Sequence, residues 1–245
     1  MNAIEARGLT KRFGPKVAVD HIDLTVKEGE LFALLGVNGA GKTTCIRMLS
    51  CLSAPAEGEC AVCGYDCTRQ QAQVKGIIGI SPQDTAVAEN LTVRENLALM
   101  AQVYGYRGSD AEERIAAMME QFRLHEVENA RAKTLSGGWK RKLSIAMALI
   151  SQPKVLFLDE PTLGLDVLAR RELWRVIEGL KGRVTVLLTT HYMEEAEQLA
   201  DRIAVMIAGR IAACGTLAEL EQQTGKTGLE EAFVAIAEGS VGENA

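Results

Sequence analysis

Residues 21–26 alternate strictly between polar and apolar side chains, with Ile22, Leu24 and Val26 at the apolar positions. This period of two predicts a half-buried β-strand. Residues 31–35 form instead a short, wholly apolar run, which predicts a buried strand. The run leads into a glycine-rich segment and then into a helix with apolar residues at helical spacing. The first part of the chain therefore predicts a strand–loop–helix unit.

Helical and strand-like patterns alternate in the second half of the chain. In chain order they predict helices over 139–150, 168–180 and 193–199, and strands over 155–158, 184–189, 203–207 and 210–213. Strands that alternate with helices are typical of a mainly parallel sheet. The sequence therefore predicts an α/β fold whose sheet is largely buried.

Residues 93–122 have helical spacing that is interrupted at Gly105 and Gly108. Ser109 and Glu112 have the spacing of a capping box, which predicts the start of a second helix there. We expect a helical subdomain inserted around 84–138 into a single domain of residues 1–238, which also contains an N-terminal antiparallel β part. Residues 239–245 are expected to be a disordered tail.

Composition limits the possible partners and location of the chain. The 245 residues carry a net charge of −5 and a pI near 5.4, so a basic surface for nucleic acid is not expected. The longest apolar runs are six residues, whereas a membrane span needs about 20. No apolar signal core follows Met1. We expect a cytosolic chain that can still dock onto a membrane partner.

The six cysteines leave two interpretations open. Cys60 and Cys63 have C-x-x-C spacing, Cys67 follows, and Cys51 is the one plausible fourth ligand of a metal site. The alternative is that they are reduced thiols that fill small spaces in the core of a cytosolic protein.

The glycine-rich segment matches the pattern G-x-x-x-x-G-K-[ST] from Gly36 to Thr43 and lies between a predicted strand and a predicted helix. In this context, backbone N–H groups and the helix N-terminus can bind phosphate oxygens. The Lys42 ammonium can reach the β- and γ-phosphates, and the Thr43 hydroxyl can bind Mg²⁺. The motif alone predicts an NTPase or a kinase.

An apolar strand over 155–158 ends in two carboxylates, Asp159 and Glu160. Asp159 is suited to the Mg²⁺ shell, and Glu160 to polarising an attacking water as general base. This pairing favours hydrolysis over kinase chemistry. The other interpretation is a solvated acidic strand end.

Residues 135–140, Leu-Ser-Gly-Gly-Trp-Lys, lie between these two motifs. With them, the chain resembles the nucleotide-binding subunits of ABC transporters over nearly its whole length. The resemblance implies a P-loop NTPase core that binds ATP and Mg²⁺. The implied nucleotide contacts are Phe13 on adenine, Gly36, Asn38, Gly39, Ala40, Gly41, Lys42, Thr43, Thr44, Gln83, the signature residues Ser136, Gly137 and Gly138, and Asp166 in the D-loop. It implies Thr43, Gln83 and Asp159 at the metal, and Glu160 and the switch residue His191 in catalysis.

The family resemblance also implies partners. The signature helix would bind the ATP held by a second copy or a similar subunit, so that two ATP molecules lie between two chains. A separate integral-membrane permease would complete an exporter at the cytoplasmic face of the cell membrane. Residues 139–142 and 230–233 resemble the drug, antibiotic and polysaccharide exporter branch. The alternatives are a soluble ABC-type ATPase in assembly, repair or translation, and a nucleotide-binding module without hydrolysis.

Several residues also have simpler interpretations or depart from the family pattern. Phe13 could be a core aromatic, Ser136 a plain helix cap, and His191 a capping or surface histidine. The departures from the pattern are Val37 in the phosphate loop, Trp139 in place of the usual Gln, and Leu163 before the D-loop glycine.

Overall fold

Strand β3 (Leu31–Leu35) lies inside a sheet whose strand order is β10-β9-β3-β8-β7-β6 in the computed structural model. The structure describes residues 1–242, with the side chains of residues 1–239. The strands of this sheet are parallel, except that β10 runs antiparallel to β9. The other strands are β6 (Ile78–Ser81), β7 (Val155–Asp159), β8 (Thr185–Thr190), β9 (Arg202–Ile207) and β10 (Arg210–Gly215). The predicted mainly parallel sheet is confirmed.

A second, antiparallel sheet has the order β2-β1-β4-β5. Its strands are β1 (Asn2–Phe13), β2 (Lys16–Lys27), β4 (Glu57–Val62) and β5 (Tyr65–Asp66). Along β2, Ile22, Leu24 and Val26 are buried while their neighbours are not, as the alternating pattern predicts. This sheet confirms the N-terminal antiparallel part.

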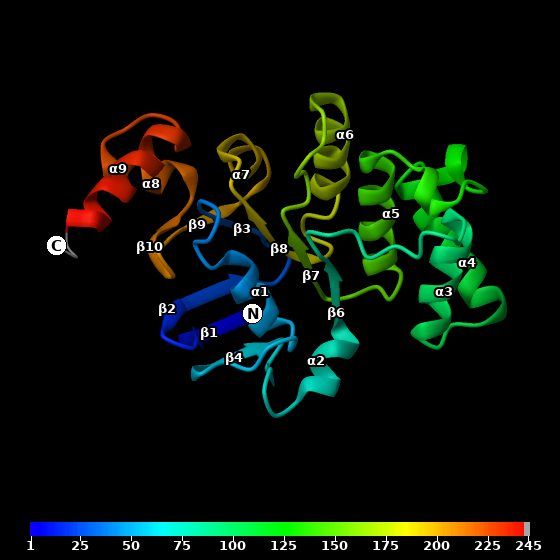
Figure 1. Ribbon diagram of the computed structural model, residues 1–245, viewed down its shortest axis with the longest axis horizontal. Coiled ribbons are helices and arrows are strands. Elements are labelled where there is room, and N and C mark those ends of the chain that lie inside the picture. The colour runs from blue at the N-terminus through cyan, green and yellow to red at the C-terminus, as the bar shows by residue number, and fades with distance from the viewer. Residues whose placement is uncertain (243–245) are drawn as a thin grey trace.

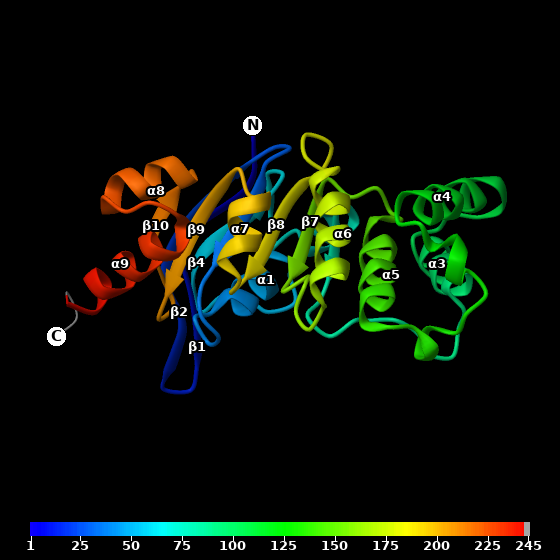
Figure 2. The same cartoon turned by 90° about the horizontal axis from the view of Figure 1, so that it is seen from above.

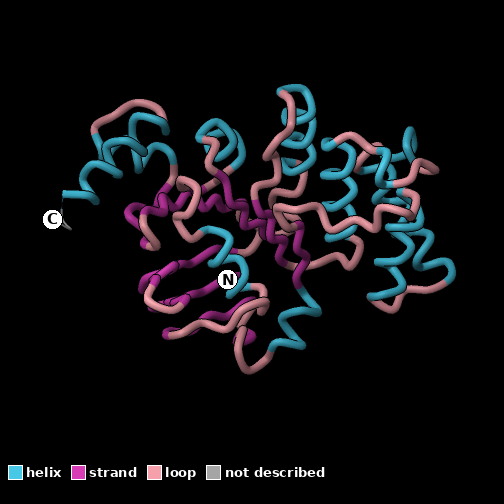
Figure 3. The backbone as a smooth tube through the Cα atoms, viewed as in Figure 1, coloured by secondary structure: helices cyan, strands magenta, loops and turns pink. Residues whose placement is uncertain are grey.

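Both faces of β3 are covered, which explains its uninterrupted apolar sequence. Phe32 and Leu34 pack into the core between the two sheets, together with helix α1 (Lys42–Leu49). Leu31, Ala33 and Leu35 face the other core, which extends into the helices. Figure 1 shows α1 between the sheets, with α6 (Val167–Glu178) and α7 (Met193–Leu199) on the opposite face of the parallel sheet. Figure 3 shows the same two groups of strands.

The helical subdomain lies to one side of the sheets (Figures 1 and 2). It contains α3 (Val93–Val103), α4 (Gly108–Gln121) and the short 3-10 helices η1 (Leu124–Val127) and η2 (Ala132–Thr134). Helix α2 (Gln71–Ile77) precedes it, and α5 (Gly137–Leu149) joins it to β7. This insert between β6 and α5 confirms the expected helical subdomain.

The capping box predicted at Ser109 is wrong. Helix α4 begins at Gly108 after Arg107, with no side-chain cap. The insert's capping box instead joins Thr92 and Glu95 at the start of α3. The pair Ser109 and Glu112 had the right spacing, but the tight turn at Gly105 and Gly108 starts the helix before Ser109.

Helices α8 (Leu217–Thr224) and α9 (Leu229–Gly242) pack at the β9–β10 edge, far from the insert (Figure 2). The tail was expected to be disordered from residue 239, but α9 continues to Gly242; residues 243–245 lie outside the described part. None of the described helices is long and apolar enough to cross a membrane.

Candidate active site

The parallel strands β3, β8 and β7 are neighbours, so their carboxyl ends meet at one edge of the sheet. The phosphate loop follows β3, Glu160 follows β7, and His191 follows β8. Ligands of open α/β sheets bind outside the carboxyl ends of the strands. This topology collects motifs that are more than 100 residues apart in the chain into one site.

The phosphate loop is shaped by two glycines that leave no room for a side chain. A Cβ at Gly36 would lie 2.4 Å from the Met206 carbonyl oxygen, and a Cβ at Gly41 would lie 2.4 Å from the Ala18 carbonyl oxygen. Gly41 also has φ 108°, where an L side chain is strained. The loop is therefore pressed against β9 and β2.

Helix α1 begins without a side-chain cap. Gly41 is its N-cap residue, so no side-chain oxygen accepts the first N–H groups, which belong to residues such as Lys42, Thr43 and Thr44. These N–H groups have no partner inside the helix, and the helix dipole favours an anion at this end. The loop and helix end together have the donors of a phosphate site. Asn38 and Gly39 lie at the exposed tip of the loop, while Ala40 is buried.

The Lys42 ammonium is buried and held by three oxygens. Its Nζ lies 3.0 Å from Glu160 Oε1, and it donates to the Gly36 carbonyl at 2.7 Å and the Val37 carbonyl at 3.2 Å. A buried charge is tolerated when it is paired and hydrogen-bonded in this way. The structure thus joins the phosphate loop directly to the carboxylate after β7.

A pair of oxygen-bearing side chains lies beside that contact. The Thr43 hydroxyl donates to Asp159 Oδ1 at 3.0 Å, and the Thr189 hydroxyl donates to the same oxygen at 2.6 Å. Hydroxyl and carboxylate oxygens are the ligands that Mg²⁺ prefers. The Gln83 side chain is exposed. Among the described residues, only the backbone carbonyl of Gln83 has a hydrogen bond in the structure, from the Arg141 guanidinium. The structure therefore brings together Thr43 and Asp159, but does not place Gln83 with them.

Glu160 is buried in an unusual backbone conformation with φ 48°. Its N–H donates to the carbonyl and the hydroxyl of Thr189, both at 3.1 Å. Its side chain spans two partners, Lys42 through Oε1 and His191 Nδ1 through Oε2 at 2.8 Å. A left-handed conformation at a residue other than glycine is costly and is enriched at functional sites. The predicted catalytic pair, Glu160 and His191, is in direct contact.

Phe13 is exposed at the end of β1, with 55% of its surface accessible. The Lys11 ammonium lies 5.5 Å from the centre of its ring. The alternative of a core aromatic is therefore wrong. The side chain is exposed enough to contact a planar ligand.

The signature residues lie at the start of α5, away from the phosphate loop. Ser136 is the N-cap residue, and its hydroxyl accepts the Trp139 N–H at 3.5 Å. Ser136 and Gly137 are exposed, while Gly138 packs closely against Ala169 of α6. In Figures 1 and 2, β7 and α6 separate α5 from α1. The start of α5 and the phosphate loop at the start of α1 therefore do not meet within one chain.

Asp166 and Trp139 have local roles in the structure. The Asp166 carboxylate caps α6 by accepting the N–H groups of Leu168 and Ala169 at 2.9 Å each. Trp139 is half-buried, and the Lys142 ammonium lies 4.4 Å from its ring centre. Trp139 thus contributes a cation–π contact where the family usually has a polar side chain.

Sequence analysis missed Arg141, which ties α5 to the segment after β6. Its guanidinium donates to the carbonyls of Pro82 and Gln83, both at 2.7 Å. Burial lowers the pKa of Arg141, and the nearby carboxylates of Asp159, Asp84 and Glu195 oppose that shift. The sequence signal was a basic run after the signature motif, but a basic run gives no sign that one of its members is buried.

Thr189 was also missed as a site residue, although it holds both Asp159 and Glu160. Its only signal was a polar residue near the end of an apolar strand. A threonine at such a position can hold a catalytic-site carboxylate only when the neighbouring strand places that carboxylate opposite it. The register pairs Thr189 with Asp159.

The site defines a class of protein: a P-loop NTPase in which the phosphate-loop threonine contacts an aspartate and a buried glutamate is paired with the phosphate-loop lysine. Residues 19–163 match the family model described as ABC transporter. The chain is 44% identical over 224 residues to the daunorubicin/doxorubicin resistance ATP-binding protein DrrA of Streptomyces peucetius, an alignment that covers 91% of this chain and 68% of DrrA.

Two solved structures are also similar. A structure of the ATP-binding subunit of an ABC transporter has a TM-score of 0.86 and 30% identity, covering 96% of this chain and 99% of its own. The dimeric post-hydrolysis structure of the ATP-binding cassette MJ0796 with ADP and Pi has a TM-score of 0.79 and 25% identity, covering 87% and 98%. The chain belongs to the ABC transporter family and is its ATP-binding, ATP-hydrolysing subunit.

Proposed function

We propose that residues 36–44 bind the phosphates of ATP and that Thr43 and Asp159 hold Mg²⁺ directly, with Gln83 completing the metal site. This proposal rests on the two contacts of Glu160, with Lys42 and with His191, beside the Thr43–Asp159 pair. Uncapped N–H groups at the start of α1 would bind the β-phosphate, and the Lys42 ammonium the β- and γ-phosphates. Mg²⁺ would neutralise charge that develops on the phosphate oxygens.

Glu160 is proposed as the general base and His191 as a γ-phosphate contact. Lys42 holds Glu160 Oε1 at 3.0 Å, so a phosphate that draws the ammonium away would free this carboxylate oxygen for water. His191 Nδ1 holds Oε2 at 2.8 Å and would keep the carboxylate oriented during that exchange. ATP binding itself would thereby activate the base.

The test of this role is Glu160→Gln, which keeps the shape and removes the base. We expect ATP binding to persist and steady-state hydrolysis to fall by roughly a hundredfold or more, within the range expected for a lost general base. Hydrolysis should be measured by phosphate release and binding by equilibrium titration. The exposed Glu197→Gln is the matched control and should hydrolyse ATP normally. Near wild-type turnover by Glu160→Gln would remove Glu160 from this role.

We also propose that the open helix end at Ser136, Gly137 and Gly138 binds the ATP held by a second copy or a similar subunit. Ser136 and Gly137 are exposed, and they lie away from the phosphate loop of the same chain. Asp166 would lie at the same interface, beside the exposed Val167 and Leu168. Phe13, with its exposed side chain, would stack on adenine.

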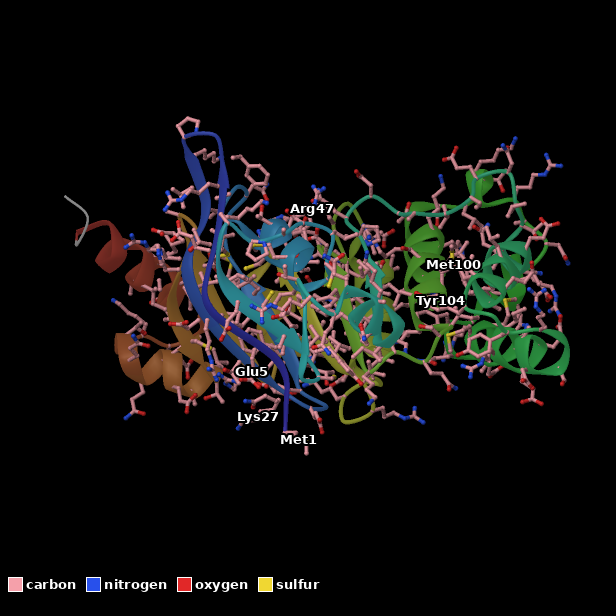
Figure 4. The ribbon with its side chains drawn as sticks, turned by 90° about the horizontal axis from the view of Figure 1, so that it is seen from below. Met1, Glu5, Lys27, Arg47, Met100 and Tyr104 are labelled. Atoms are coloured by element: carbon pink, nitrogen blue, oxygen red, sulfur yellow. The ribbon has the colours of Figure 1, made fainter. Side chains whose placement is uncertain are left out.

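A groove of about 430 Å³ between the insert and the core is proposed to receive an amphipathic helix of an integral-membrane permease. Its insert wall includes Met100, Val103 and Tyr104, and its core wall includes Leu52 and Ile80. In Figure 4, Met100 and Tyr104 lie on the side of the insert nearest the core. Apolar grooves of this kind accept the apolar face of a helix.

The transporter would then be an exporter at the cytoplasmic face of the cell membrane. Its similarity to a daunorubicin/doxorubicin resistance ATP-binding protein supports export as the direction. The same similarity supports a transport role over the alternative of a soluble ATPase in assembly, repair or translation. The cargo would be selected by the permease.

A further inference from the structure

Cys60 and Cys67 lie directly opposite each other on the β4–β5 hairpin. The hairpin pairs Val62 with Tyr65 and Ala61 with Asp66, and the next step of this register pairs Cys60 with Cys67. The Cys67 N–H accordingly donates to the Cys60 carbonyl at 2.9 Å. Opposite residues of an antiparallel pair have Cα atoms about 4.5–5.5 Å apart, within the 4.4–6.8 Å range of disulfides.

The two buried thiols also contact the carboxyl end of helix α1. Cys60 Sγ lies 4.0 Å from the Met48 carbonyl oxygen, and Cys67 Sγ lies 3.4 Å from the Leu49 carbonyl oxygen. The Met48 carbonyl also accepts the backbone N–H of Cys51 at 3.1 Å, so the cap that depends on a thiol is the one from Cys67 to the Leu49 carbonyl. The Cys67 thiol thus caps the helix whose other end carries Lys42 and Thr43, about 12 Å away at 1.5 Å per residue.

The electrostatics of the pair favour reaction at Cys60. Contact with the Cys67 thiol lowers the pKa of Cys60, whereas contact with Cys60 and burial raise the pKa of Cys67. Cys60 is then the more acidic of the two thiols. A lowered pKa is what distinguishes a reactive cysteine from an inert core thiol. Among the described residues, no group of three or more His, Cys, Asp or Glu side chains is placed to hold a metal ion, so the metal interpretation gains no support.

We propose that Cys60 and Cys67 are a modification site at which a peroxide forms a reversible disulfide, and that this bond loosens α1 and weakens nucleotide binding. The disulfide itself does not depend on the proposed function, whereas the effect on nucleotide binding rests on it. Oxidation removes the Cys67 S–H donor from the Leu49 carbonyl, so the last turn of α1 loses this cap.

The reaction balances with hydrogen peroxide as the oxidant. The Cys60 thiolate attacks one peroxide oxygen, the O–O bond breaks, and the departing hydroxide takes up a proton to give water. The Cys67 sulfur then attacks the sulfenic acid at Cys60, the S–O bond breaks, and the second oxygen leaves as water with the Cys67 proton. Two thiols lose two electrons, which the peroxide gains.

The experiment uses the full chain with Cys214→Ser, which removes the exposed thiol and with it disulfides between molecules. The protein is treated with hydrogen peroxide, alkylated, and mapped by peptide mass spectrometry. We expect a linked Cys60–Cys67 peptide that is lost on reduction with dithiothreitol. The oxidised sample should bind ATP about two- to fivefold more weakly than the reduced one, as expected for the loss of one weak hydrogen bond.

Matched variants separate this pair from the half-buried thiols nearby. Cys63→Ser should retain the link, and both Cys67→Ser and Cys67→Ala should abolish it and make ATP affinity insensitive to peroxide. Five alkylated cysteines in the peroxide-treated Cys214→Ser chain, or a link through Cys51 or Cys63, would overturn the assignment. A Cys60–Cys67 link with unchanged ATP affinity would overturn the effect on α1. Failure of the reduced protein to bind ATP would count against the proposed function instead, while the mapping would still decide the disulfide.

Discussion

Glu160 shows how one side chain is positioned by residues from three different strands and loops. Its backbone φ of 48° costs about 1–3 kcal/mol at a residue other than glycine. The two bonds from its N–H to Thr189 offset part of that cost. Lys42 and His191 then hold one carboxylate oxygen each. The carboxylate position is therefore a property of the β3–β8–β7 edge and not of Glu160 alone.

Lys42→Ala should weaken ATP binding on the order of ten- to a hundredfold, because it removes charge-assisted bonds to phosphate. The substitution also leaves Glu160 buried without its cation, which could disturb the site. The double variant Lys42→Ala/Glu160→Gln controls for that effect by removing the unpaired charge. Equilibrium ATP titration should show a similar loss relative to Glu160→Gln. Wild-type affinity in either Lys42 variant would contradict the phosphate role.

Glu195 should make stability depend on pH. The side chain is fully buried and accepts the Trp174 indole N–H at 3.1 Å, with Thr162 and Thr190 beside it. Burial raises the pKa of Glu195, and Glu160 raises it further. A raised folded-state pKa contributes stability that is fully present below the unfolded pKa near 4.5 and is lost as pH rises through the folded pKa.

Relative to Glu195→Gln, the free energy of unfolding of the wild type should therefore fall by roughly 1.4 kcal/mol per pH unit as pH rises from the unfolded pKa to the folded pKa of Glu195. Urea unfolding of both proteins between pH 5 and about 8 measures this difference. The exposed Glu197→Gln should follow the wild type. Parallel curves for wild type and Glu195→Gln would mean that Glu195 is ionised in the folded protein.

The strands and helices differ in how far sequence alone predicts them. Strands β3 and β7 were predictable because burial on both faces demands an apolar run. The phosphate loop was predictable because its glycine pattern is required by the fold: a Cβ at Gly36 or Gly41 would lie 2.4 Å from a backbone carbonyl oxygen. The start of α4 was not, since a nearby glycine turn overrode a good capping pair. The Arg141 and Thr189 contacts were not either, because they depend on which strands become neighbours.

The groove between the insert and the core gives a test of coupling between elements. Ala86 is exposed and lines this groove, within the segment 84–90 that joins β6 to the insert. In the assembled transporter with Cys214→Ser, Ala86→Cys should crosslink to a cytoplasmic loop of the permease, with a yield that changes when ATP is added. Ser109→Cys, exposed on α4 and outside the groove lining, is the control and should not crosslink. A crosslinking yield that ATP does not change would argue against a movement of the segment at Gln83 that links the nucleotide site to the permease.

The starts of helices α1 and α5 lie apart in the molecule, so the proposed shared ATP site requires two chains. The start of α1 faces the site built on β3, β7 and β8, while the start of α5 opens at an exposed surface beyond α6. The exposed Val167 and Leu168 lie next to the D-loop, where a second chain would cover them. In a two-fold symmetric dimer, each α5 would serve the ATP of the other chain.

Mixing two inactive variants tests this arrangement. Ser136→Arg puts bulk and charge at the start of α5, and Lys42→Ala disables the phosphate loop; each alone should be inactive as a homodimer. If Ser136 acts on the partner's ATP, a heterodimer carries both lesions in one site and none in the other. ATPase activity should then return, up to roughly half of normal per heterodimer if the sites act independently, and less if they are coupled. If Ser136 acts within its own chain, each heterodimer site carries one lesion and no activity returns.

Heterodimers purified with two different affinity tags make the comparison direct, and a mixture of Ser136→Arg with itself under two tags is the control. If ATPase activity does not return in heterodimers whose two sites are shown to work independently, the proposal of a shared site is wrong. A helix α5 that does not contact the ATP of the other chain cannot restore activity there.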